Sequence, residues 1–172
     1  MTNFSSMLRF SGIIIFFTCL CGGESFAQSP LEPMKWLLGE WKGEGTGQPG
    51  QGEGGFTLET SLDGKVLVRK NRSSYPAKDN KPAFVHDDIM IVFPEANQLK
   101  SMYWDNEGHL IRYSVAASES KIVLLSDPVP NAPQFRLTYD KLDERTVNVL
   151  FDMSRDGEKF VNYTTGKCRK VR

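Results

Sequence analysis

Short segments in which hydrophobic and polar residues alternate follow one another through most of the chain. A period of two is typical of β-strands that bury one face. In one such segment Phe135, Leu137 and Tyr139 fall on one face, and polar or charged residues fall on the other. About ten strands are predicted in this way, at 40–47, 55–62, 65–75, 85–93, 99–104, 110–117, 121–126, 134–142, 146–153 and 159–171.

Turn-forming residues separate many of these predicted strands, at 62–64, 94–97, 106–108 and 155–157. Strands joined by turns this short must be antiparallel neighbours, because a parallel crossover needs about a dozen residues or more. Closing such a sheet on itself removes its exposed edges. We therefore predict an all-β fold, a closed antiparallel up-and-down β-barrel of about ten strands. A β-sandwich is the alternative.

The residues before the first strand predict a short helix. Pro30 or Pro33 suits the first turn of a helix, and Gly39 suits its end. Leu31, Met34 and Leu38 would share one face at helical spacing. We expect this helix to pack across one end of the barrel.

Residues 1–27 have the pattern of a cleaved signal peptide. Arg9 precedes an apolar run at 12–20, and the small residues Ser25 and Ala27 then mark a cleavage site before Gln28. The run is too short for a permanent membrane helix. We expect an exported protein, periplasmic or secreted, whose single β-barrel domain occupies residues 28–172 and has no stable membrane anchor.

Composition argues against several classes of function. The 21 basic and 21 acidic residues cancel, which disfavours nucleic acid as a partner. Beyond residue 27 Cys168 is the one cysteine, so the domain can form no internal disulfide and no multi-thiolate zinc site. We expect Cys168 to fill space in the core.

A short helix followed by a Gly-x-Trp-x-Gly strand lies in the segment from Trp36 to Gly47. This segment resembles the opening of calycins, the lipocalins and fatty-acid-binding proteins, and is most similar to nitrobindin-like and related bacterial barrels. The resemblance implies that Trp41 packs across the closed end of a barrel and that Gly39 and Gly43 allow a close approach of the backbone. It makes these three residues a structural motif.

Nitrobindin-like proteins bind heme through a histidine on the closing strand. The matching stretch of this chain, 157–166, offers Asn162 and Tyr163 but no histidine. We therefore assign no cofactor, and Tyr163 remains the one alternative ligand to iron in that stretch.

The two histidines were considered as metal ligands. His86 and Asp88 lie two residues apart and would project from the same face of a strand. Two ligands do not complete a site, so we assign no metal and interpret this segment as a solvated strand start. His109 follows a predicted turn and is expected at the surface.

Charged and aromatic residues of the predicted strands are the remaining candidates for a binding site. An arginine inside the barrel would need a partner, and a carboxylate ligand would suit it. Arg69 or Arg72 are candidates, whereas alternation places Arg112 and Arg136 on the outer face. The predicted cavity residues, which line or fill the interior, are Trp104, Tyr113, Tyr139, Phe151 and Tyr163.

These observations favour a non-enzymatic barrel that holds a small, largely apolar ligand. The inference rests on fold analogy. Two alternatives stay open. One is a barrel enzyme, an isomerase or hydrolase acting on a small organic molecule. The other is a solid-core envelope protein that acts through its surface, with a homodimer as an option.

Overall fold

The computed structural model describes residues 29–45, 52–78 and 82–171. The predicted signal peptide lies outside this part of the chain. Within the described residues there is one short helical segment, η1 (Glu32–Leu37), and ten strands. The strands are β1 Gly39–Gly43, β2 Glu53–Ser61, β3 Val66–Tyr75, β4 Phe84–Glu95, β5 Gln98–Asp105, β6 Leu110–Ala117, β7 Lys121–Ser126, β8 Gln134–Asp143, β9 Thr146–Ser154 and β10 Val161–Lys170.

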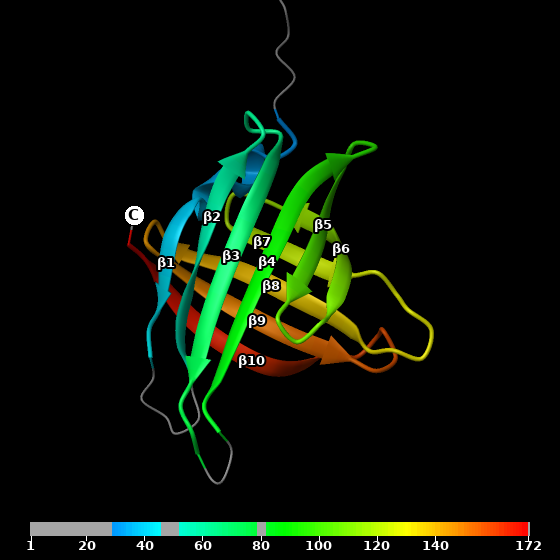
Figure 1. Ribbon diagram of the computed structural model, residues 1–172. Helices are drawn as coiled ribbons and strands as arrows, with labels where there is room; N and C mark the ends of the chain where they lie inside the picture. The colour runs from blue at the N-terminus through cyan, green and yellow to red at the C-terminus, as the bar shows by residue number, and fades with distance from the viewer. Residues whose placement is uncertain (1–28, 46–51, 79–81, 172) are drawn as a thin grey trace, which may run out of the picture.

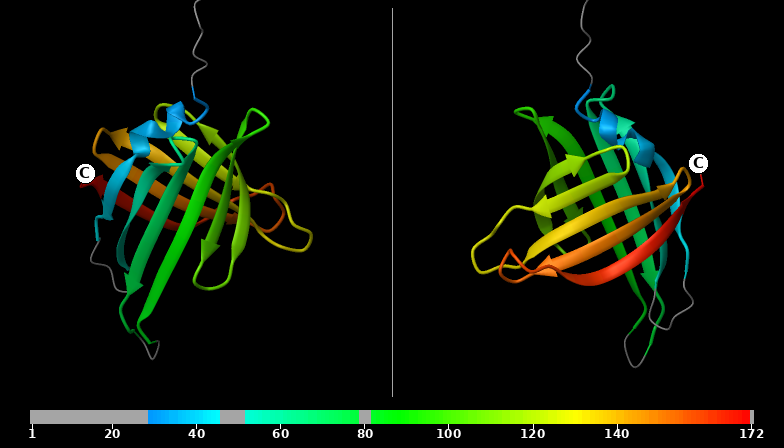
Figure 2. Two further views of the ribbon diagram at one scale, coloured as in Figure 1. Left: turned by 45° about the horizontal axis from the view of Figure 1, so that its top comes forward. Right: turned by 180° about the vertical axis from the view of Figure 1, so that it is seen from behind.

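The strands form a closed barrel in which each strand pairs with its neighbours in sequence. All pairs are antiparallel, and β1 closes the sheet by pairing with β10, where Trp41 faces Lys170. Figure 1 shows β2, β3 and β4 at the front and β7 to β10 running across behind them. In both views of Figure 2 the blue segment η1 lies over one end of the barrel, which we call the helix end.

The predicted fold is confirmed, including the number and direction of the strands. Turn residues set the connections as expected. Ala96 and Asn97 both have positive φ angles, 46° and 64°, which suits the two-residue turn between β4 and β5. Several strand boundaries differ from the prediction; β2, for example, begins at Glu53 rather than at residue 55. Gly55 lies within this strand. A Cβ at this position would collide with the backbone oxygen of Trp41, so the close pairing of β1 and β2 requires glycine here.

The predicted short helix is a six-residue 3₁₀ helix. A 3₁₀ helix has about three residues per turn, so residues three apart share a face. Leu31, Met34 and Leu37 are accordingly buried, whereas Leu38, which α-helical spacing had favoured, is only partly buried. This face packs on the hydrophobic core at the helix end.

Trp41 occupies the centre of this packing. Its side chain is buried, its indole Nε1 donates a hydrogen bond to the Leu37 carbonyl at 2.8 Å, and its ring stacks on Phe56 at 6.0 Å between centroids. Gly39 next to η1 has φ 118°, a conformation that favours glycine. A Cβ on Gly43 would lie 3.0 Å from the carbonyl oxygen of Gly54, so the glycine permits close approach of β1 to β2.

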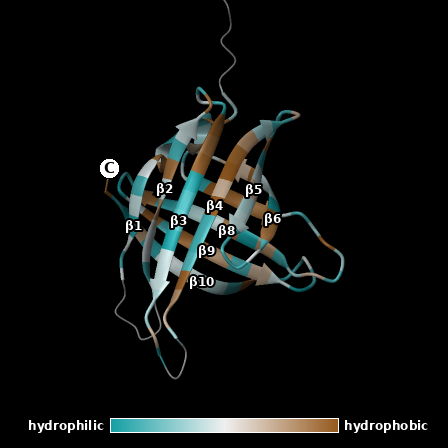
Figure 3. Ribbon diagram, viewed as in Figure 1, coloured by the Kyte–Doolittle hydropathy of each residue, from teal (hydrophilic) through white to brown (hydrophobic). Residues whose placement is uncertain are grey.

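The interior is divided along β3 and β4. Figure 3 shows brown, hydrophobic segments in the parts of both strands nearest to η1 and teal, hydrophilic segments farther along them. Near η1 the two strands contribute buried Leu67 and Val92, whereas farther away they contribute buried Arg69 and Asp88. We call the second region the polar half of the interior. It positions the candidate site described next.

Candidate functional site

A buried ion pair forms the centre of the polar half. Arg69 on β3 and Asp88 on β4 are buried and alternate with neighbours that are more exposed, so both side chains point into the barrel. Arg69 Nη1 lies 2.6 Å from Asp88 Oδ1, and the two side chains are 8% and 3% exposed. Asn71 Nδ2 donates a hydrogen bond of 2.9 Å to the other carboxylate oxygen. Asp88 is thereby held on both oxygens.

The guanidinium of Arg69 also contacts the aromatic core. It lies over the Phe56 ring, 5.4 Å from the centroid, and Phe56 meets Tyr139 edge-on at 5.5 Å. Burial alone would lower the pKa of Arg69, but Tyr139 and Asp88 outweigh that effect and raise it. The arginine is therefore a fixed positive charge inside the barrel.

Three buried polar atoms lack a hydrogen-bond partner within the described residues. They are Arg69 Nε, Ser101 Oγ and Tyr139 OH. Burial raises the pKa of Tyr139 to about 12, although Arg69 nearby opposes this effect, so the phenol keeps its proton. The Arg69 guanidinium lies within reach of the Tyr139 hydroxyl and opposes the rise in its pKa, but no well-aligned hydrogen bond joins the two side chains. Arg69 Nε and Tyr139 OH are therefore buried donors without an acceptor among the described residues.

The polar half continues from Asp88 to the rim of the barrel. His86 Nε2 lies 3.3 Å from Asp88 Oδ2 and 3.1 Å from the hydroxyl of Tyr103. Tyr103 donates its proton to Asp105 Oδ2 at 3.0 Å. Burial, with Asp88 and Asp105 close by, raises the pKa of Tyr103 far above its ordinary value. A continuous chain of polar contacts thus connects buried Arg69 with the solvent.

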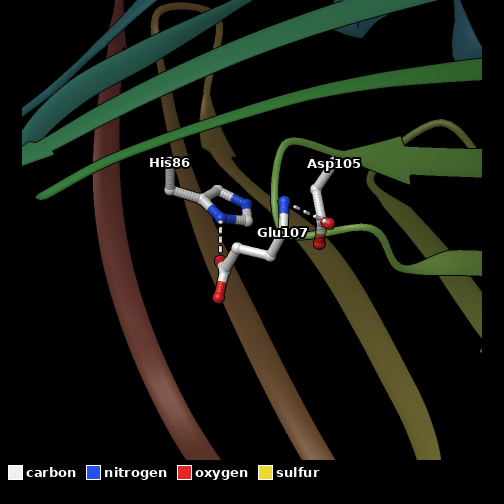
Figure 4. A group of neighbouring side chains, drawn as sticks. All are labelled: His86, Asp105 and Glu107. Carbon is white, nitrogen blue, oxygen red and sulfur yellow. Dashed lines mark hydrogen bonds and ion pairs between the residues drawn. The ribbon is translucent and has the colours of Figure 1, made fainter.

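The turn after β5 completes this rim cluster, which consists of His86, Asp105, Glu107 and His109. Glu107 Oε1 lies 2.8 Å from His86 Nδ1, and His109 Nδ1 lies 2.8 Å from Asp105 Oδ2. Burial would raise the pKa of Asp105, but hydrogen bonds from His109, Tyr103 and Glu107 lower it overall. Figure 4 shows the Glu107 carboxylate against the His86 ring and the Asp105 carboxylate accepting a hydrogen bond from the Glu107 backbone N–H.

This geometry corrects the interpretation of His86 and Asp88 as a solvated strand start. Asp88 is buried, and the side chain of His86 is only 23% exposed. Both point inward, because β4 places them on the face that also carries Met90. His109 is 63% exposed in its side chain, and its surface position in a turn is confirmed.

Of the arginines considered from the sequence, Arg69 is the one that turns inward. Arg72 pairs with Asp87 at 3.0 Å, and both side chains are well exposed on the outer face. Arg136 pairs with Asp152 at 2.8 Å. A carboxylate partner for the inward arginine was expected, and the chain itself supplies one in Asp88.

The aromatic residues predicted from the sequence fall in three environments. Tyr113 and Tyr139 are buried in the core, and Phe151 is partly buried against it. Tyr163 is 73% exposed and meets Phe151 edge-on. Trp104 lies between inward-pointing neighbours and pairs in register with the exposed Ile89, which places it on the outer face. The role of these residues in ligand binding remains a prediction.

An open groove of about 990 Å³ lies along β1 to β5. Its lining includes the outward-facing Lys70, Ile89 and Trp104, together with Asn71 and Asp88 of the polar half. An open surface of this kind would leave much of a small ligand in water, whereas binding sites usually bury most of it. We therefore place the candidate ligand site in the polar half of the interior.

Fold and site together define the class of this protein as a closed antiparallel β-barrel with a buried polar cluster in its interior. Its topology is consistent with the calycin-like barrels that the Gly-x-Trp segment resembles. No protein-family model matches the sequence, and no curated protein shows significant similarity to it. Among the described residues, no helix is long and apolar enough to cross a membrane.

Proposed function

We propose that this protein is an exported, non-enzymatic barrel that holds a small, largely apolar organic molecule in its interior. The polar end of that molecule accepts hydrogen bonds from Arg69 and Tyr139. One observation carries the proposal: a buried arginine, already paired with Asp88, still has an unsatisfied Nε donor, and the nearby Tyr139 hydroxyl is also unsatisfied.

The cost of this arrangement supports the proposal. A buried donor without a partner costs about 1–3 kcal/mol relative to its hydrated state. A buried ion pair is seldom more stable than well-packed hydrophobic residues of similar volume. A ligand oxygen that accepts hydrogen bonds from Arg69 and Tyr139 would remove the cost of the unsatisfied donors. It would also explain why the chain keeps a buried ion pair at this position instead of hydrophobic residues.

The chemistry of the donors selects the ligand class. Arg69 Nε can only donate, and a protonated Tyr139 donates readily. The matching ligand group is a carbonyl or carboxylate oxygen. The aromatic and aliphatic residues around the pair, among them Phe56 and Met90, suit an apolar body.

The proposal includes a fold relationship to nitrobindin-like proteins without their heme chemistry. The closing strand offers no histidine at 157–166, and Tyr163 is mostly exposed to solvent. We therefore propose an organic ligand, and we expect the purified protein to show no Soret band in its absorption spectrum.

Native mass spectrometry of protein purified gently from its own host tests the proposal. We expect a chain that begins at Gln28 and carries one small molecule of defined mass. The double variant Arg69→Met/Asp88→Leu should lose that molecule. The matched control is Arg72→Met/Asp87→Leu, which removes the corresponding pair on the outer face and should retain it.

Two results would count against separate parts of the proposal. A bare chain mass, persisting after incubation with a lipid extract, would exclude the ligand site and favour a protein that acts through its surface. A chain that retains residues 1–27 after passage through the envelope would exclude the cleaved signal peptide without affecting the ligand site.

An enzyme is the second candidate, and one contact favours it. His86 Nε2 lies 3.3 Å from the buried Asp88 carboxylate, an arrangement that can orient a general base. A bound molecule that is converted to a species of different mass or different retention time during incubation would favour an isomerase or hydrolase over a carrier.

A further inference from the structure

The rim cluster brings three metal-ligating groups together from separate positions in the chain. One ligand atom each from His86, Asp105 and Glu107 lies within 4.8 Å of the others. His86 comes from β4, Asp105 from the end of β5, and Glu107 from the turn that follows (Figure 4). Atoms this close need only small side-chain rotations to surround one cation.

The contacts around His86 indicate which ring nitrogen carries the proton and which is free. Tyr103 gives its proton to Asp105, so toward His86 its oxygen acts as an acceptor. Asp88 Oδ2, the other neighbour of Nε2, is also an acceptor. Both contacts place the proton on Nε2. In a neutral imidazole the lone pair is then on Nδ1, and it faces Glu107 Oε1 at 2.8 Å.

Two acceptors that face each other at this distance need a positive charge between them. A shared proton is one solution, and a metal cation is the other. The local charge favours the metal, because Asp105 and Glu107 contribute two carboxylates while Arg69 is already paired with Asp88, and a divalent cation offsets more of this charge than a single proton does. His109 is the remaining basic group at the cluster, and it contacts Asp105.

We propose that His86 Nδ1, Asp105 and Glu107 bind a divalent first-row transition-metal cation of the Zn²⁺ class at the rim of the barrel. Imidazole nitrogen combined with carboxylate oxygen is a ligand set that Zn²⁺ accepts, whereas Ca²⁺ takes oxygen ligands alone. His109 lies beside Asp105 and is available as a further ligand.

The surroundings of His86 resemble the support that metal-binding histidines normally have. Such a histidine almost always donates its second ring N–H to a carboxylate, a backbone carbonyl or water. Here Asp88 takes that position, and Arg69 and Asn71 in turn hold Asp88. This arrangement goes beyond the proposed ligand site, since it needs no organic molecule in the interior.

Zn²⁺ titration of the purified protein by calorimetry tests the inference. The protein should first be stripped with a chelator. We expect one saturable site. Glu107→Gln should weaken binding about 100-fold or more, because it removes a direct ligand, and Tyr103→Phe about 10-fold, because it removes a supporting contact.

The matched control is Glu119→Gln, which makes the same charge change in another exposed turn and should leave the affinity unchanged. Glu107→Gln and Glu119→Gln binding Zn²⁺ equally well would overturn the inference, as would the absence of any saturable site.

Imidazole ¹⁵N resonances provide a second measurement that does not depend on affinity. Zn²⁺ should shift the Nδ1 resonance of His86 and leave Nε2 protonated. Zn²⁺ that leaves the His86 resonances unchanged would place the metal elsewhere and would contradict the proposed site, even if calorimetry detected binding.

Discussion

The two halves of the barrel interior differ in how they contribute to the stability of the fold. At the helix end, Leu31, Met34 and Leu37 pack around Trp41, whose indole donor is satisfied. In the polar half, an ion pair is buried and donors lack partners. The first half stabilises the fold by removing apolar surface from water. The second half costs stability, and that cost is what supports the proposed role of the polar half in ligand binding.

The largest expected effect lies at the helix end. Trp41→Ala removes a fully buried ring together with its stacking on Phe56, and should lower the free energy of unfolding by about 4 kcal/mol. Urea denaturation measures this value. Trp104→Ala is the control, because Trp104 lies on the outer face; its loss should stay below about 1 kcal/mol. Equal losses would contradict the division between a packed interior and an outer face.

The second prediction concerns the ion pair. Asp88→Asn leaves the buried charge of Arg69 uncompensated and should cost about 3 kcal/mol of unfolding free energy. Replacing both partners, in Arg69→Met/Asp88→Leu, should recover most of that loss. The outer pair provides the comparison, since Asp87→Asn beside Arg72 should change the free energy by less than about 0.5 kcal/mol.

If the double variant were as unstable as Asp88→Asn alone, the pair itself would be a source of stability. The polar half would then need no functional explanation, and the comparison between the two halves would fail.

Alkaline pH should weaken the fold to a smaller extent. Burial raises the pKa of Cys168 from 9.0 to about 11 and that of Tyr139 from 10.0 to about 12. The native chain therefore keeps protons that the unfolded chain releases. Stability is fully present below about pH 9 and is lost as the pH rises toward 11 and 12, and Cys168 alone should contribute a loss of about 2 kcal/mol at pH 10.5.

Urea midpoints at pH 8 and at about pH 10.5 measure this loss. Cys168→Ala should remove the part of the loss that sets in first, because the Cys168 thiol titrates at the lowest pH, and should leave the part due to the buried tyrosines. A midpoint independent of pH would show that these groups are hydrated in the native state.

The smallest expected change in unfolding free energy concerns single buried hydroxyl groups. Tyr139→Phe removes a buried hydroxyl that has no partner, so the unfolding free energy of the unliganded protein should stay within about 1 kcal/mol or increase. Tyr103→Phe removes a hydroxyl that contacts His86 and Asp105, and should cost about 1–2 kcal/mol. A larger loss for Tyr139 than for Tyr103 would mean that the Tyr139 hydroxyl has a partner.

The fold could be predicted because its signals are local. Alternation in 134–142 and the two-residue turn at Ala96 and Asn97 each act within a few residues of sequence. The helix at the start was assigned the wrong period, since six residues are too few to distinguish α from 3₁₀ spacing. In the structure Leu37 is buried and Leu38 is only partly buried, as 3₁₀ spacing requires.

The candidate site could not be predicted by the same rule. In β3 the face that carries Arg69 and Asn71 is as polar as its opposite, so alternation does not show which face is buried. The register of β4 and β5 is the one local signal that points to the site. The turn at Ala96 and Asn97 sets the register in which Asp88 faces Asp105, and continuing that register by two residues brings His86 opposite Glu107.

Nuclear magnetic resonance of the Arg69 side chain tests the central claim most directly. The Nε–H signal of Arg69, assigned by comparison with Arg69→Lys, should be recorded for the ligand-free protein and again after addition of a lipid extract. We predict that the signal shifts and exchanges more slowly with solvent once an acceptor is bound. An Nε–H that is already protected in the ligand-free protein, and that does not change on addition of the extract, would contradict a ligand site in the polar half.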